Sequence, residues 1–219
     1  LAYATSALRE AKNSNIITSR VKSETGIEIE IIDGLREARI ISNAKPIEKN
    51  NPLRKNLYVD VGGGSTELSF VQNGEKTISK SFNIGTVRGL NKRNKDDVWN
   101  NIKDWIEDHL DIDFKLKLYG TGGNINKIQY LTNTKTGKPI TYFSMITLLN
   151  NLSKINFEKR VLEYNLNPDR ADVILPALNI FLKTMEWSGS NKIYVPKVGL
   201  VDGMIKEVYY EGMGVKLEF

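Results

Sequence analysis

Alternation of apolar and polar residues predicts a series of short strands along this chain. The first clear example is residues 27–32, IEIEII, where isoleucine and glutamate alternate as in a half-buried strand. The dipeptide Asn73-Gly74 separates two apolar runs and favours a tight hairpin there. Runs rich in branched and aromatic residues predict the other strands, at 1–4, 57–61, 67–71, 77–82, 115–119 and 193–195.

Helical spacing of apolar residues predicts helices between these strands. The clearest is at 95–110, where Val98, Ile102 and Ile106 fall on one face. Pro168 suits the first turn of a helix that we expect to reach Trp187. The other helices are expected at 14–25, capped by Ser14 or Asn15, at 35–43, from Asn124, and at 144–154, 157–164 and 199–210.

The order of these elements predicts an α/β fold with a duplicated unit. Residues 57–210 read β-β-β-α-β-α-β-α, and residues 1–43 read β-α-β-α, the second half of the same order. Two such units facing across a cleft form the actin-like (ribonuclease H-like) architecture. We therefore expect 1–43 to be the C-terminal part of a first domain truncated at its start, and 44–219 to be a complete second domain. Residues 43–56, rich in Asn, Pro and Lys, are the expected linker.

The most informative stretch is 57–70, LYVDVGGGSTELSF, in which two strand-like runs flank three glycines. Glycine permits positive φ and has no Cβ, so backbone N–H groups can converge on an anion. The flanking acids, Asp60 and Glu67, offer hard oxygen ligands of the kind that Mg²⁺ accepts, usually through water. The plainer alternative is an ordinary glycine-rich hairpin with surface acids. The turn predicts a phosphate held beside a metal by Gly62, Gly63, Gly64 and Ser65.

A second glycine turn follows the strand predicted at 115–119. It contains Gly122 and Gly123, and we expect it to open a helix at Asn124. Helix N-termini bind anions through their free N–H groups, so both glycines are candidates for phosphate binding. Close packing of the helix on the strand would explain the same glycines without a ligand.

Composition narrows the classes of function. The chain has 219 residues, 40% of them hydrophobic, which is enough for a folded core. Its net charge of +5 suits a negatively charged partner, but the 26 interspersed acids argue against a nucleic-acid binder. The absence of cysteine excludes disulfides and thiolate chemistry and fits the cytoplasm. No apolar run is long enough to span a membrane.

Seven stretches of the sequence match motifs of one known family. They are ATSALREAKN (4–13), IEIEIIDGLREARI (27–40), VDVGGGSTEL (59–68), SFNIGTVRGL (81–90), GTGGNI (120–125), RADVILPA (170–177) and VGLVDGMI (198–205). They cover nearly the whole chain and occur in the family's order. On these stretches the chain resembles the exopolyphosphatase/guanosine pentaphosphate phosphohydrolase (Ppx/GppA) family of the actin-like superfamily.

This resemblance implies an activity and a set of site residues. The implied activity removes terminal phosphate from polyphosphate or from guanosine pentaphosphate, with Mg²⁺ as cofactor, in a protein that forms homodimers. On the family's motifs, Glu37 maps to the catalytic position and Arg9 to a phosphate-facing position. Asp60 and Glu67 map to the metal-holding positions, and the first glycine turn maps to a phosphate loop.

The sequence also departs from the family's pattern. The first phosphate loop, D-x-G-S-N-S, is absent, which puts the activity of this chain by itself in question. Arg36 replaces the first glutamate of the EEAR motif and inverts the charge beside Glu37. Asn124 stands where the family usually has threonine, and Asp202 stands where glutamate is common.

Two other functions remain open on the sequence. An actin-like kinase or ATPase would share the glycine turn, but such enzymes lack the DGxxEAR segment. A non-catalytic protein that binds polyphosphate or guanosine tetra- or pentaphosphate is compatible with Arg36 and with the missing loop.

Overall fold

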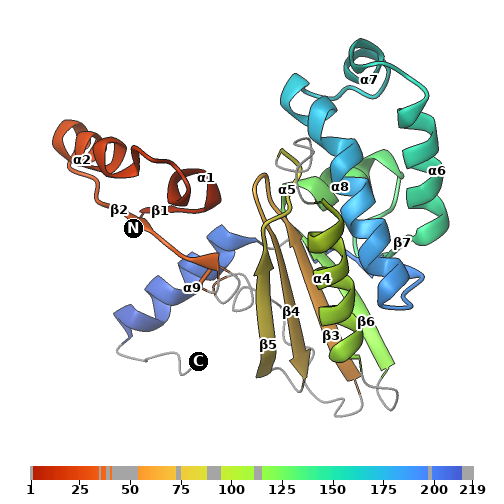
Figure 1. The fold of residues 1–219 in the computed structure, drawn as a ribbon, viewed down its shortest axis with the longest axis horizontal. Helices are drawn as coiled ribbons and strands as arrows, with labels where there is room; N and C mark the ends of the chain where they lie inside the picture. The colour runs from red at the N-terminus through yellow and green to blue at the C-terminus, as the bar shows by residue number, and fades with distance from the viewer. Residues whose placement is uncertain are drawn as a thin grey trace.

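The chain folds into a large α/β body and a smaller N-terminal body beside it (Figure 1). The computed structural model describes residues 2–34, 36–37, 40, 54–72, 75–87, 95–110, 115–196 and 199–213. Within these ranges, no helix is both long enough and apolar enough to cross a bilayer.

A six-stranded sheet organises the larger body. Its strands lie in the order β5-β4-β3-β6-β8-β7. β3 and β5 are antiparallel to β4, whereas β6 runs parallel to β3 and β8 runs parallel to β6. The carboxyl ends of β3 and β6 therefore meet at one edge of the sheet. The strands are β3 (Arg54–Val61), β4 (Thr66–Gln72), β5 (Glu75–Phe82), β6 (Lys115–Thr121), β7 (Ile140–Thr141) and β8 (Lys192–Tyr194).

Helices cover one face of this sheet (Figure 1). The long helix α8 packs against α4, α5, α6, α7 and β3. Together they enclose the main core, in which Phe70, Ile106, Leu118 and Phe181 are almost completely buried. The helices are α4 (Lys95–Asp108), α5 (Gly122–Leu131), α6 (Tyr142–Ser153), α7 (Phe157–Glu163) and α8 (Pro168–Trp187).

The two faces of the sheet differ because side chains alternate along each strand. Leu57 and Val59 of β3 belong to the core under the helices. The intervening Tyr58 lies on the opposite face, where it stacks on Tyr119 of β6 with ring centroids 4.7 Å apart. Asp60 follows Tyr58 by two residues, so it projects from that same opposite face, at the carboxyl end of β3.

The N-terminal body is built around two short parallel strands. β1 (Ala2–Ala4) pairs with β2 (Ile29–Ile31), and the helices α1 (Ser6–Arg9) and α2 (Ser14–Thr25) connect them. α2 ends at Gly26, whose φ of 73° is the left-handed conformation that commonly terminates helices. A helical segment starts at Gly34 after β2, and its residues Arg36, Glu37 and Ile40 are helical.

Two glycines allow the N-terminal body to approach the rest of the protein closely. A Cβ on Gly34 would lie 2.6 Å from Cβ of Ser81 in β5. A Cβ on Gly203 would overlap the backbone carbonyl of Ile40, so helix α9 (Leu200–Gly212) lies directly against the segment that contains Ile40. The helical start at Gly34 is thus held next to the large sheet.

The predicted α/β fold and its order of elements are confirmed, with local differences. The predicted strand 27–32 is paired only over Ile29–Ile31, and α2 begins at Ser14 with Asn13 as its cap. The two-residue strand β7 was not predicted, because two residues carry no periodicity. β6 continues through Gly120 and Thr121, so Gly122 and Gly123 lie within the first turn of α5 and not in a loop before it.

The linker predicted at 43–56 is wrong at its end, because β3 begins at Arg54. Residues 43–53 and the predicted Asn73-Gly74 turn lie outside the described residues. The division into domains at 1–43 and 44–219 stays a prediction.

Candidate functional site

Asp60 and Glu67 face each other across the first hairpin of the sheet. They are directly opposite in the β3–β4 register. Glu67 is only 3% exposed, and its Oε1 accepts a hydrogen bond from Ser81 Oγ of β5 at 2.9 Å. The hairpin thus brings both predicted metal-holding acids together on the face of the sheet opposite the main core.

The first glycine turn joins these two strands and is braced by the segment after β5. Gly62 N–H donates to the Ser65 carbonyl at 2.9 Å, which closes the turn. Thr86 N–H and Val87 N–H donate to the carbonyls of Gly62 and Gly63 at 3.0 and 2.8 Å. The carbonyls of Gly62 and Gly63 are therefore held by hydrogen bonds from the segment 85–87.

Gly85 makes this brace possible, and its replacement should disturb the turn. A Cβ at Gly85 would lie 2.5 Å from the Gly63 carbonyl oxygen and 2.7 Å from the Gly64 carbonyl carbon. We expect Gly85→Ala to lower the free energy of unfolding by about 1–3 kcal/mol through overpacking, and to weaken any anion binding at the turn. Chemical denaturation measures the first effect. Gly212→Ala is the control, since a Cβ there meets nothing within 4 Å; equal stability of the two variants would contradict the prediction.

Glu37 reaches the same region from the N-terminal body. Its helical segment is capped by Asp33, whose Oδ1 accepts from Arg36 N–H at 2.7 Å and whose carbonyl accepts from Glu37 N–H at 3.0 Å. The Glu37 side chain is 13% exposed. Because Gly34 packs on Ser81, this helix starts close to the strand that also contacts Glu67.

Arg9 contacts Glu37 directly. Arg9 Nη1 lies 3.4 Å from Glu37 Oε2 and donates to the Ile32 carbonyl at 2.7 Å. Both side chains are largely buried, with 22% of Arg9 and 13% of Glu37 exposed. The predicted phosphate-facing arginine and the predicted catalytic glutamate therefore lie side by side, joined by an ion pair that orients both.

The carboxylates are close enough to influence each other's ionisation. Burial raises the pKa of Glu37, while Arg9 opposes the shift and Asp60 adds to it. Burial also raises the pKa of Glu67 to about 8; the Glu37 charge adds to this shift, and a hydrogen bond from Ser65 opposes it. The charges of Glu37, Asp60 and Glu67 therefore interact beside the first glycine turn, where Ser65 also hydrogen-bonds to Glu67.

The second glycine turn lies against Asp60. Thr121 Oγ1 donates to Asp60 Oδ2 at 2.6 Å. Gly122 has φ of 88°, and a Cβ there would lie 3.0 Å from Asp60 Oδ1. Gly123 lies beside the guanidinium of Arg170. Both glycines thus fall at the candidate site, where their neighbours are the side chains of Asp60 and Arg170.

Sequence reasoning missed three side chains of this site: Thr121, Ser81 and Arg170. Arg170 Nη1 donates to Asn124 Oδ1 at 3.2 Å, and Asn124 Nδ2 donates to the Val61 carbonyl at 2.7 Å. Asn124, which departs from the family's threonine, therefore links α8 to the carboxyl end of β3. All three residues belong to matched stretches, but only pairing across the sheet indicates what they contact.

Arg36, the other notable departure, is paired with polar groups of its own body. Its guanidinium contacts Glu30 in an ion pair, donates to the Tyr3 hydroxyl at 2.8 Å, and lies 5.1 Å from the Tyr3 ring centroid. The charge inversion next to Glu37 is therefore balanced locally by Glu30.

The donor set at the hairpin fits a hydrated Mg²⁺ ion. Across the described ranges, no cluster of three or more His, Cys, Asp or Glu side chains is arranged to hold a metal. Mg²⁺ commonly takes only one or two carboxylates and completes its shell with water and phosphate oxygens. Asp60 and Glu67 could supply those carboxylates, and a cation would offset the burial and the Glu37 charge that together raise the pKa of Glu67.

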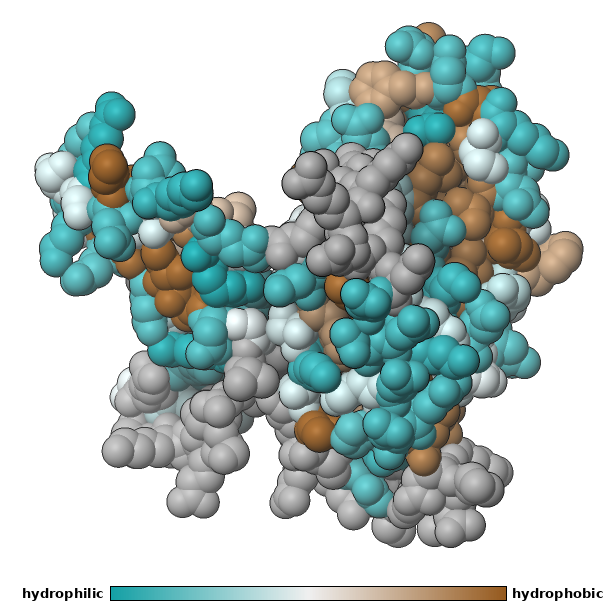
Figure 2. All heavy atoms as spheres, in the orientation of Figure 1, coloured by the Kyte–Doolittle hydropathy of each residue, from teal (hydrophilic) through white to brown (hydrophobic). Residues whose placement is uncertain are grey.

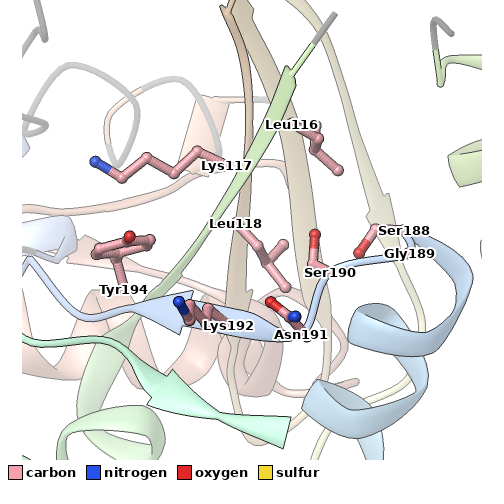
Figure 3. A pocket seen from close by; sticks show the side chains of 9 residues that line it. All are labelled: Leu116, Lys117, Leu118, Ser188, Gly189, Ser190, Asn191, Lys192 and Tyr194. Atoms are coloured by element: carbon pink, nitrogen blue, oxygen red, sulfur yellow. The ribbon is translucent and has the colours of Figure 1, made fainter.

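A separate cavity of about 460 Å³ lies near the amino ends of β6 and β8 (Figure 3). Its polar lining includes Lys117, Ser190 and Lys192, while Leu116 and Leu118 supply apolar walls. Asp60 and Thr121 lie at the carboxyl ends of β3 and β6, so this cavity is not part of the carboxylate site.

Comparison with known proteins shows which family the chain belongs to. The family model described as the Ppx/GppA phosphatase family matches residues 1–210. Exopolyphosphatase 1 of Mycobacterium leprae is 32% identical over 115 residues, which cover 50% of this chain and 34% of that protein. The guanosine-5'-triphosphate,3'-diphosphate pyrophosphatase of Photobacterium profundum is 36% identical over 92 residues, which cover 42% of this chain and 18% of that protein.

The chain thus spans about a third or less of the length of these curated relatives. The crystal structure of the Aquifex aeolicus member of the Ppx/GppA family superposes with a TM-score of 0.73 at 29% identity. That superposition covers 96% of this chain and 74% of the Aquifex chain. The match to the family model extends over nearly all of the sequence, from the N-terminal body to α9, and the chain therefore belongs to the Ppx/GppA phosphatase family.

Proposed function

We propose that this protein releases terminal phosphate from a phosphoanhydride chain, either inorganic polyphosphate or the 5′ chain of guanosine pentaphosphate. The single observation that supports this most is the meeting of Glu37 with Asp60 and Glu67 beside the first glycine turn. Relatives named exopolyphosphatase and guanosine-5'-triphosphate,3'-diphosphate pyrophosphatase support the choice of substrates.

In this proposal Glu37 is the general base. It orients a water molecule in line with the terminal phosphorus and accepts its proton as the new P–O bond forms and the bridging P–O bond breaks. The shortened chain leaves as a phosphate anion. A pKa raised by burial suits such a base, because its proton affinity is then higher than that of an exposed carboxylate.

Arg9 serves the base and the substrate in the proposal. Its contact with Glu37 Oε2 fixes the carboxylate, and its anchoring to the Ile32 carbonyl limits its motion. The remaining guanidinium donors can face a phosphoryl oxygen, since arginine carries five N–H donors.

The glycine turn and the acids complete the site. Backbone N–H groups around Gly63, Gly64 and Ser65 would hold the terminal phosphate, and Asp60 and Glu67 would hold Mg²⁺ through water. When bound, Mg²⁺ would neutralise charge on the phosphoryl oxygens. In this proposal Gly122 and Gly123 also lie next to the bound phosphate.

The direct test is phosphate release from purified protein with long-chain polyphosphate, guanosine pentaphosphate and ATP, each with and without Mg²⁺. Mg²⁺-dependent release from either of the first two supports the proposal, and release from ATP alone would favour the kinase or ATPase alternative. Tight binding of polyphosphate without turnover would favour a non-catalytic binder and contradict the proposed activity.

The metal role of Asp60 gives a separate prediction. Asp60→Asn should raise the Mg²⁺ concentration needed for half-maximal phosphate release about tenfold or more, because it removes one negative charge from a weakly coordinated cation. The measurement is an activity titration against Mg²⁺. Asp202→Asn is the control, since Asp202 Oδ2 accepts from Gly199 N–H at the start of α9. An unchanged requirement in Asp60→Asn would mean that Asp60 only makes turn hydrogen bonds.

The homodimer implied by the family resemblance also stays a prediction. Sedimentation velocity of the purified protein measures it, and a monomer at micromolar concentration would contradict it.

A further inference from the structure

Thr121 pairs with Asp60 across the parallel strands β3 and β6. The two residues are register partners at the carboxyl end of both strands. The Thr121 hydroxyl is 2.6 Å from Asp60 Oδ2, and Thr121 is only 1% exposed. A hydrogen bond to a carboxylate is stronger than one between neutral groups, and burial strengthens it further.

Gly122 lies next to the same carboxylate. Its φ of 88° is left-handed, so the chain turns immediately after Thr121 and brings the Gly122 α-carbon next to Asp60. A Cβ there would lie 3.0 Å from Oδ1 and 3.3 Å from Oδ2. A side chain at position 122 would crowd the Asp60 carboxylate, and glycine is the residue that lets the backbone turn this close to it.

We infer that the second glycine turn acts through Asp60, with Thr121 as the positioning residue that orients its carboxylate toward the site. The inference rests on the proposed function and deepens it. Thr121 fixes one carboxylate oxygen by hydrogen bonding, and the absence of a side chain at Gly122 leaves room for the carboxylate in that orientation. The turn thereby links α5 to the hairpin that carries Glu67.

The test compares Thr121→Val, Thr121→Ser and Thr184→Val. Valine keeps the shape of threonine but lacks the hydroxyl, and serine keeps the hydroxyl. Thr184 is a matched control because it is also 1% exposed, and its Oγ1 donates to the Ile180 carbonyl at 2.9 Å within α8. Thermal unfolding of all three variants shows whether each is folded.

Loss of a hydrogen bond to a charged group predicts a fall of about tenfold to hundredfold in kcat for Thr121→Val. The KM for the phosphoanhydride substrate should change little, because the lost hydrogen bond is made to Asp60, which is proposed to hold the metal and not the substrate. Calorimetric titration with Mg²⁺ alone should show a raised Kd for Thr121→Val. Thr121→Ser should recover most of the wild-type kcat and most of the wild-type Mg²⁺ affinity. Thr184→Val should match wild type in both.

A Thr121→Val protein with wild-type kcat and wild-type Mg²⁺ affinity would overturn the inference. So would a crystal structure of Thr121→Val in which the Asp60 carboxylate keeps its orientation. These outcomes are separable from failure of the proposed function. If wild-type protein releases no phosphate, the proposed activity fails, while the crystal structure still decides whether Thr121 orients Asp60.

Discussion

Replacing Glu37 by glutamine is expected to lower kcat for phosphate release by about 10²–10⁴-fold, the usual contribution of a general base. Glutamine has nearly the same shape and keeps an acceptor for Arg9, whose Nη1 lies 3.4 Å from the present carboxylate. It cannot accept the proton of the attacking water. Substrate affinity should therefore be almost unchanged, and the loss should appear in kcat and in kcat/KM equally.

The measurement is steady-state phosphate release, together with equilibrium binding of polyphosphate. Glu24→Gln is a suitable control, because Glu24 is also paired with an arginine, Arg20, but on the exposed surface of α2. It should retain wild-type kcat. Near-normal turnover in Glu37→Gln, with its fold intact, would remove Glu37 from the role of base.

The buried Glu67 is expected to make the metal-free protein less stable as the pH rises. Its pKa is about 8 in the folded protein, against an ordinary value of 4.5, because burial and the nearby Glu37 charge disfavour ionisation. Between these values the folded protein binds a proton that the unfolded chain has lost. The free energy of unfolding should therefore fall with rising pH across this window, by about 1.4 kcal/mol per pH unit from this group alone.

Glu67→Gln should remove that part of the slope, because an amide does not titrate and its oxygen can still accept from Ser81 Oγ. Urea unfolding at pH 5 and pH 8, both in a metal chelator, measures the effect. The variant should gain stability relative to wild type at the higher pH. If the free energies of unfolding of wild type and Glu67→Gln differ by the same amount at pH 5 and at pH 8, the raised pKa of Glu67 is contradicted.

Much of the hairpin could be predicted from sequence because its contacts are local. The residues that pair across it are separated only by the turn, so strand alternation and three glycines suffice to bring Asp60 opposite Glu67. The helix that carries Glu37 was likewise predictable, since its cap Asp33 and its first turn are adjacent in the chain. The boundaries of α8 were predicted correctly, because Pro168 marks its start.

The contacts of the second glycine turn could not be predicted in the same way. Its glycines indicated an anion or close packing, and the structure brings Gly122 against Asp60 through the pairing of β6 with β3. Parallel strands are joined by long crossovers, so their register cannot be read from neighbouring residues. Arg9 illustrates the same limit, because its partner Glu37 lies 28 residues away in the sequence.

The sequence by itself determined the types of element, the faces of the strands and the chemistry that each motif carries. These follow from short-range rules: the period of apolar residues, the conformational freedom of glycine and the capping of helices. Only the tertiary structure decided which motifs share a site. Burial of Glu37 and Glu67 next to each other, with raised pKa values, requires the N-terminal body to pack on the sheet through Gly34 and Ser81. That packing depends on close contact between distant segments, which no local pattern encodes.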